Sequence, residues 1–124
     1  MTSDLRTFFD GYNASFGKGP SSIANFYFEH CITARIGNVR LNATKANTEA
    51  FFSQVLQRYH SQGFHHGSIS SFDSRPIGIN SVIVTIKWAY KDSNDKTLWE
   101  WTFSYNMYKS GGAWKILLQT MHDS

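Results

Sequence analysis

The chain has 124 residues, a formal net charge of +3 and a single cysteine, so an internal disulfide is excluded. A chain of this length buries a core without metal or disulfide support, and we expect one domain over residues 1–124. The basic residues are spread along the sequence rather than clustered, which argues against nucleic acid as a partner. No apolar run has signal-peptide length or the ~18 residues that cross a bilayer, so we expect a cytoplasmic protein without a membrane partner.

Two helices are predicted at the start of the chain. The first has apolar residues at helical spacing, which are Leu5, Phe8, Phe9, Tyr12 and Phe16. Ser3 or Asp4 is available to cap it, and the Gly-Lys-Gly-Pro sequence at 17–20 ends it. A short second helix over residues 21–27 follows.

A strand pair and a long helix come next. We expect strands over 31–36 and 39–42, joined by a two-residue turn at Gly37-Asn38. The long helix is predicted between Thr44 and Gly63, because its apolar residues form one wide stripe and glycine suits the position after a helix. The stripe consists of Phe51, Phe52, Val55, Leu56 and Tyr59.

The last part of the chain predicts four strands. A polar strand over 65–73 and a turn at 76–78 precede three strands with bulky apolar residues at every second position. The residues of this one parity are Val82, Val84, Ile86, Trp88, Tyr90, then Trp99, Trp101, Phe103, Tyr105, Met107, and finally Trp114, Ile116, Leu118 and Thr120. Alternation of this kind places each set on one face of a sheet.

This order of elements predicts an α+β fold. A strongly curved mixed or antiparallel sheet wraps around the long helix and the two N-terminal helices, giving a cone with an open mouth. The helices cover the concave face. The other face, with Leu98, Tyr108, Leu117 and Met121, is apolar enough to predict a homodimer through the sheet.

Three passages carry a resemblance to a known family. They are the run from Phe26-Tyr27-Phe28 to Arg35, the helix start at Glu49-Ala50-Phe51-Phe52, and the closing Gly112-Ala113-Trp114-Lys115-Ile116. With the element order, they resemble the NTF2-like superfamily, which has a cystatin-like fold, and within it the SnoaL-like domains. The resemblance implies an α+β cone, usually dimeric, with a hydrophobic pocket between sheet and helices. It implies no single activity, since this fold hosts isomerases, dehydratases, cyclases, epoxide hydrolases, ligand carriers and assembly domains.

Ketosteroid-isomerase-like chemistry is disfavoured by one residue. Members of that kind would carry a tyrosine donor on the first helix, where Tyr12 stands, and a carboxylate base near the end of the first strand. Arg35 stands around the base position, and a guanidinium cannot accept a proton at neutral pH. Arg35 could instead hold a carboxylate, or it could be a surface arginine at a strand edge.

Other reactive side chains give weaker signals. His30 and His122 could serve as general acid or base in a dehydratase. Neither has an obvious orienting Asp or Glu in its local sequence, although Asp73 and Glu100 could approach through the fold. His65 and His66 would point to opposite faces of a strand, and with no cysteine pairs or HExxH pattern we expect no metal. Cys31 is expected to be inert packing.

Glu100 lies between Trp99 and Trp101 and should point away from both rings. It would become the best acid candidate for the pocket only if that strand faced the other way.

We therefore expect a small-molecule-binding domain with an aromatic-lined hydrophobic pocket, in which lyase or isomerase chemistry stays open, and with no cofactor. The ligand would be small and apolar or acidic. The residues expected to line the pocket are Tyr12, Phe16, Arg35, Phe52, Tyr59, Trp88, Trp101, Tyr105 and His122. The alternative is a non-enzymatic dimerisation or assembly module whose pocket is filled by its own side chains.

Overall fold

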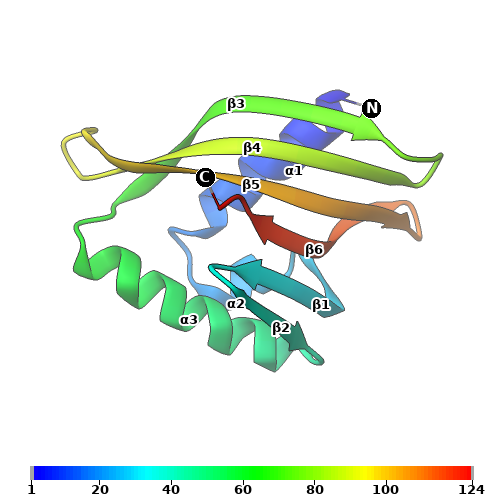
Figure 1. Ribbon diagram of the computed structural model, residues 1–124, viewed down its shortest axis with the longest axis horizontal. Coiled ribbons are helices and arrows are strands. Elements are labelled where there is room, and N and C mark those ends of the chain that lie inside the picture. Colours follow the sequence, from blue (N-terminus) through cyan, green and yellow to red (C-terminus); the bar gives the residue numbers. More distant parts are fainter. Residues whose placement is uncertain (1, 124) are drawn as a thin grey trace.

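The computed structural model describes residues 2–123, which form three helices and six strands (Figure 1). In chain order these are α1 (Thr2–Ser15), α2 (Pro20–Ala24), β1 (Tyr27–Arg35), β2 (Asn38–Asn42), α3 (Lys45–Ser61), β3 (His66–Pro76), β4 (Ser81–Lys91), β5 (Thr97–Ser110) and β6 (Ala113–Met121). The runs of helix and strand confirm the expected α+β class. None of the helices within residues 2–123 combines the length and apolar character that crossing a membrane requires.

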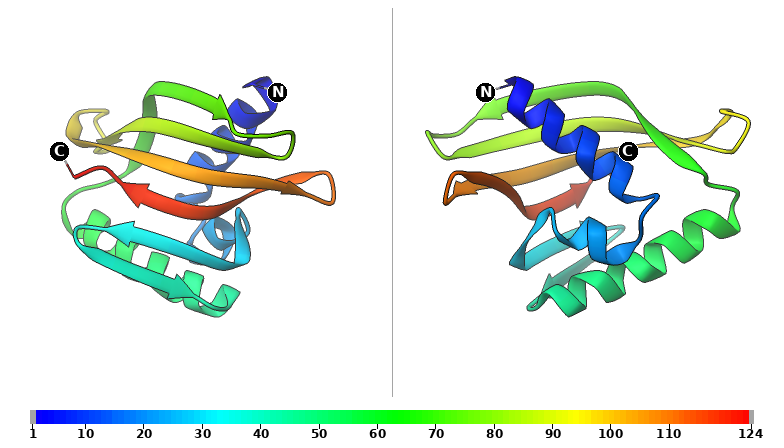
Figure 2. Two further views of the ribbon diagram at one scale, coloured as in Figure 1. Left: turned by 45° about the vertical axis from the view of Figure 1, so that its right-hand side comes forward. Right: turned by 180° about the vertical axis from the view of Figure 1, so that it is seen from behind.

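The six strands form one sheet in the order β2-β1-β6-β5-β4-β3. The last four strands make the expected antiparallel meander, and β1 runs parallel to β6, so the sheet is mixed. The sheet curves, and Figure 2 shows α1 crossing its inner face while α3 runs past the end that carries β1 and β2. This arrangement is the cone expected from the sequence.

The helix boundaries follow from local chemistry. The Thr44 side chain accepts a hydrogen bond of 3.2 Å from the Asn47 amide at the start of α3, and Gly63 takes a positive φ of 93° after its end. These two residues confirm the predicted limits of α3. The first helix starts earlier than expected, at Thr2, so Asp4 lies in its first turn instead of capping it.

The second helix and first strand also differ from expectation. Pro20 begins α2, because a proline at the first helical position loses no hydrogen bond. The helix ends at Ala24, and Tyr27, which we assigned to it, opens β1. The turn between β1 and β2 lies at Ile36-Gly37, one residue before the predicted turn.

The alternation predicted for β4 and β5 is confirmed. Every second residue from Val82 to Tyr90 is buried on the inner face, and Trp99, Trp101, Phe103, Tyr105 and Met107 are their neighbours across the strands. The buried side chains form one core between the sheet and the helices.

The alternation predicted for β6 is wrong beyond Ile116. The pairing of β5 with β6 shifts between Asn106 and Met107, which inserts Leu117 as an extra residue. Gln119 and Met121 therefore turn inward and are 3% and 6% exposed. Met121 does not belong to the outer face, where we had placed it.

The other three residues assigned to the outer face divide between exposed and half-buried. Tyr108 and Leu117 are 44% and 47% exposed. Leu98 is only half-buried, and it lies at a second shift in pairing, between β4 and β5, next to Gly63 at the end of α3.

Candidate ligand-binding cavity

The interior of the cone is almost full. Its cavity measures about 20 Å³, roughly the space of one water molecule. Tyr12, Phe16, Phe52, Trp88 and Tyr105, five residues that we expected to line the pocket, all line this small space. The structure brings these five residues together, and their rings leave no room for an organic ligand.

Hydrogen bonds hold these rings in place. The Tyr12 and Tyr27 hydroxyl groups lie 2.7 Å apart, and Gln119 Nε2 donates to the Tyr27 hydroxyl at 2.9 Å. Trp88 Nε1 donates to the Tyr105 hydroxyl at 2.9 Å. Burial raises the pKa of Tyr12, Tyr27 and Tyr105 well above the ordinary value, so all three hydroxyl groups stay neutral.

A larger cavity, of about 390 Å³, opens at the mouth of the cone. We call it the mouth cavity. It lies between α3, the β1–β2 hairpin, and the parts of β5 and β6 that face them. The lining residues are Thr33, Arg35, Ile36, Asn38, Val39, Arg40, Phe51, Gln54, Arg58, Tyr59, Gln62, Trp99, Trp101 and Met121.

Arg35 and Tyr59 line both cavities and thus separate them. Arg35 Nη2 donates a hydrogen bond of 2.8 Å to the Tyr59 hydroxyl. Three rings surround the guanidinium, with centroids 5.1 Å away for Phe103 and 5.8 Å away for both Phe51 and Trp101. The base of the mouth cavity is therefore a cation enclosed by aromatic rings.

No acidic side chain in residues 2–123 pairs with Arg35, because none of the ion pairs found there includes it. Burial opposes the charge, but the Tyr59 hydrogen bond and the neighbouring tyrosines outweigh burial and raise the pKa of Arg35. The side chain is therefore a charged group without a counter-ion in the described part of the chain.

Three polar atoms of the cavity's lining residues are buried without a hydrogen-bond partner in the described part of the chain. They are Thr33 Oγ1, Arg35 Nε and Trp99 Nε1. Each can donate a proton, and the two nitrogens can only donate. Buried donors of this kind are usually satisfied by water or by a bound molecule.

The rim adds positive charge. Arg40 and Arg58 line the cavity, and Arg40 Nε donates to Asn42 Oδ1 at 3.1 Å with its guanidinium 5.6 Å from the Phe51 ring. The lining contains no Asp, Glu, His or Cys among residues 2–123. The cavity thus offers donors, cations and flat rings.

The remaining candidates lie elsewhere. His122 lines neither cavity; its Nε2 lies 2.7 Å from the Ser104 hydroxyl on the outer face. His30 is exposed, and its Nδ1 contacts the Ala43 carbonyl. Glu100 faces outward as expected and lies 3.5 Å from Lys87, while Cys31 is buried beside Thr48.

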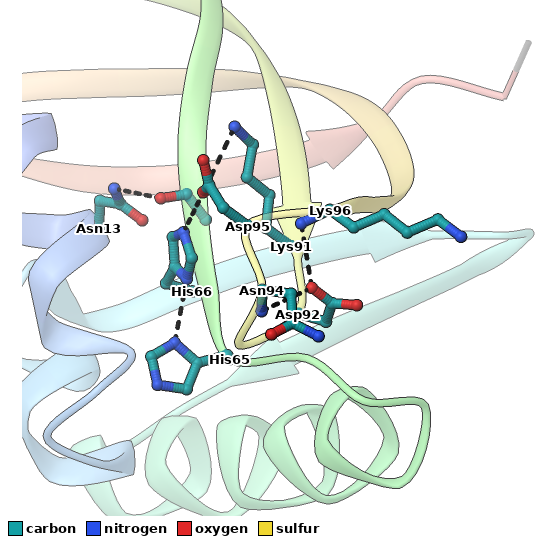
Figure 3. Close-up of polar contacts among 9 residues, drawn as sticks. Asn13, His65, His66, Lys91, Asp92, Asn94, Asp95 and Lys96 are labelled. Atoms are coloured by element: carbon teal, nitrogen blue, oxygen red, sulfur yellow. Dashed lines mark hydrogen bonds and ion pairs between the residues drawn. The ribbon is translucent and has the colours of Figure 1, made fainter.

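The histidine pair at the start of β3 was expected to diverge, but its rings meet (Figure 3). His65 Nδ1 lies 3.0 Å from His66 Nδ1, and His65 lies just before the first residue of β3. His66 Nε2 lies 2.9 Å from Asp95 Oδ1, which ties β3 to the β4–β5 turn. Within residues 2–123, no three His, Cys, Asp or Glu side chains are arranged to hold a metal ion.

Several lining residues were missed from the sequence. Trp99 has the same parity as Trp101, and Phe51 belongs to the stripe of α3, so both carried a signal. Arg40 is paired with Thr33 across the hairpin, which only the correct turn reveals. Met121 carried no signal, because the extra residue in β6 turns it inward.

Comparison with known proteins gives one family. A family model described as NTF2-like protein (DUF6841) matches residues 3–124. No curated protein matches the chain.

Solved structures share the fold. An NTF-2 like protein of unknown function from Shewanella oneidensis MR-1 is 16% identical, with a TM-score of 0.77 over 98% of each chain. A domain of unknown function with a cystatin-like fold from Nostoc punctiforme PCC 73102 is 13% identical, with a TM-score of 0.76 over 100% of this chain and 79% of that one. A putative calcium/calmodulin dependent protein kinase II association domain from Xanthomonas campestris is 18% identical, with a TM-score of 0.71 over 97% of this chain and 86% of that one. Identities this low show a common fold and nothing more.

Proposed function

Because the chain belongs to the NTF2-like family, whose fold does not define an activity, we propose a function from the mouth cavity: the protein binds a small organic molecule there. The observation that carries this proposal is the contrast between the two cavities. The interior holds about 20 Å³, whereas the mouth cavity holds about 390 Å³ and lies in the range of small-molecule sites.

The chemistry of the lining supports binding. Trp99, Trp101 and Phe51 supply apolar area, and a few donors can fix a ligand's orientation. Pockets for small molecules commonly combine these two features. Lyase or isomerase chemistry would need a group that accepts a proton, and the guanidinium of Arg35 does not do so. We therefore favour a carrier or sensor over an acid–base enzyme.

Nuclear magnetic resonance tests the proposal with two probes, naphthylacetate and the neutral naphthylethanol. Trp99 and Trp101 line the cavity, while Trp88 and Trp114 do not. We expect at least one probe to shift the indole N–H signals of Trp99 and Trp101 while leaving that of Trp114 in place.

A matched pair of variants provides the control. Trp101→Ala removes a wall of the cavity and should weaken binding by about tenfold or more, because this half-buried aromatic side chain offers a ligand a large contact area. Trp114→Ala removes another half-buried tryptophan outside the lining and should leave binding unchanged. Failure of both probes to shift either indole signal, or equal weakening by both variants, would contradict the proposal.

A second candidate, compatible with the first, is a dimerisation or assembly module. The outer face over β2, β1 and β6 carries Val39 and Leu41, which are 79% and 67% exposed, beside Ile32, Ala34 and Leu118. We propose that this patch joins two copies of the chain. The mass of the protein in solution tests it.

A further inference from the structure

We propose that the ligand of the mouth cavity is a carboxylate on a flat apolar body, and that Arg35 receives the carboxylate group. This inference rests on the proposed function, because it names the chemical class that the same cavity binds.

Arg35 needs an anion that the described chain does not provide. Among residues 2–123, its side chain donates a hydrogen bond to the Tyr59 hydroxyl and enters no ion pair. Buried charges in proteins are usually paired, because desolvating an isolated ion is costly. A ligand anion entering from the mouth cavity would remove this cost.

The unpartnered donors favour a ligand group that accepts hydrogen bonds. Arg35 Nε, Trp99 Nε1 and Thr33 Oγ1 all lack a partner in residues 2–123. Carboxylate oxygens only accept hydrogen bonds, and a carboxylate matches the planar fork of a guanidinium. An amide supplies one acceptor oxygen and brings two further donors. An amine brings donors only.

The walls of the mouth cavity favour a ligand that has a flat body and no positive charge. Trp99 and Trp101 lie with their centroids 5.7 Å apart, and Phe51 lines the same cavity from α3. Arg40 and Arg58 at the rim, with no acidic residue in the described lining, favour the approach of anions and oppose cations.

The test compares three ligands of one shape by isothermal titration calorimetry at neutral pH: naphthylacetate, naphthylacetamide and naphthylethylamine. We expect naphthylacetate to bind about tenfold to a hundredfold more tightly than the amide, as charge-assisted hydrogen bonds commonly contribute. The amine should bind more weakly than the amide.

Variants assign this preference to Arg35. Arg35→Met should remove the preference for the acid over the amide, whereas Arg35→Lys should keep part of the preference, since it retains charge without the fork. The control Arg75→Met removes an exposed arginine of β3 outside the cavity and should change nothing.

The outcomes separate the two proposals. Equal affinity for acid and amide, or a full preference for the acid in Arg35→Met, would overturn the carboxylate assignment while the cavity remains a binding site. If none of the three ligands binds, the proposed function itself fails. Should Arg35→Met not fold, Arg35→Lys and the wild-type preference still decide the assignment.

Discussion

Arg35 is the residue at which stability and ligand binding are expected to conflict. Its guanidinium gains from one hydrogen bond and from three nearby rings. Contacts between a cation and aromatic rings recover only part of what the ion loses when water is removed. Without a ligand, the protein should therefore be less stable than it would be with an apolar side chain at this position.

We predict that Arg35→Met raises the free energy of unfolding by about 1 kcal/mol in the absence of ligand. Arg35 is half-buried and its Nε is buried without a partner in residues 2–123, and apolar replacement of such a desolvated ionic group is often stabilising. Tm should rise by a few degrees. Urea unfolding and calorimetry measure both quantities. Arg75→Met, at an exposed position, should stay within about 0.5 kcal/mol of wild type. A clear loss of stability in Arg35→Met would mean that the arginine is structural.

For Arg35, the sequence predicts where the residue lies but not what its charge pairs with. It places Arg35 near the end of the first strand and suggests an anionic partner, and Arg35 does line the cavity. It could not show whether an acidic side chain of the fold supplies that partner. Tyr59, which binds Arg35, lies 24 residues away on α3, so only the packing of helix against sheet brings the two together.

The β1–β2 hairpin is the element whose local sequence fits its geometry least well. The two turn residues, Ile36 and Gly37, have positive φ values of 48° and 77°. Such turns match the twist of a hairpin and favour Asn-Gly. A β-branched residue with positive φ is strained. Ile36 also lines the mouth cavity and is 73% exposed, so little burial compensates for this strain.

We predict that Ile36→Asn stabilises the protein by about 1 kcal/mol, because asparagine adopts positive φ more readily and completes the preferred turn sequence. Urea unfolding followed by circular dichroism measures the change. Val39→Asn is the matched control: the same kind of substitution on an extended strand should destabilise. Loss of stability in Ile36→Asn would show that the isoleucine side chain, rather than the backbone, dominates at this turn.

The strands show how far alternation can be trusted. Period-two patterning separated the two faces of β4 and β5, since their central pairing runs in register from Ser81 to Tyr90, and the structure shows which face is the inner one. It did not do so for β6, because one extra residue reverses the faces beyond it. Leu117 has nothing in its local sequence that marks a bulge. The inward positions of Gln119 and Met121 are consequences of pairing with β5, which no single strand encodes.

At the scale of the whole molecule, the sequence predicted the cone but not where its open space lies. The count of aromatic residues is compatible with an empty or a full interior. The outcome depends on how the rings pack: Tyr12 alone has ring neighbours on α1, β1, β4 and β5. This packing fills the centre and leaves the open space at the mouth, between α3 and the β1–β2 hairpin.

The outer face of the sheet divides into a polar and an apolar half. Toward β3 and β4 it carries Thr85 and Lys87, and on β5 Glu100 and Ser104. Over β2, β1 and β6 it is mostly apolar, with Ile32, Ala34, Val39, Leu41 and Leu118, and Thr120 as a polar neighbour. The edge strand β2 belongs to this half. An exposed apolar edge of this kind is a liability in a monomer and is normally covered.

We predict that two copies of the chain cover this patch, so sedimentation equilibrium should give twice the 14.2 kDa of one chain. Leu41→Lys places a charge in the patch and should shift the equilibrium to the monomer, since burying an unpaired charge at an interface is costly. Ile79→Lys changes an apolar residue that is 89% exposed in the turn after β3, far from the patch in the order of strands, and should leave the mass unchanged. A wild-type protein that stays at 14.2 kDa at the highest soluble concentration would rule out the dimer, and equal dissociation by both variants would place the interface elsewhere.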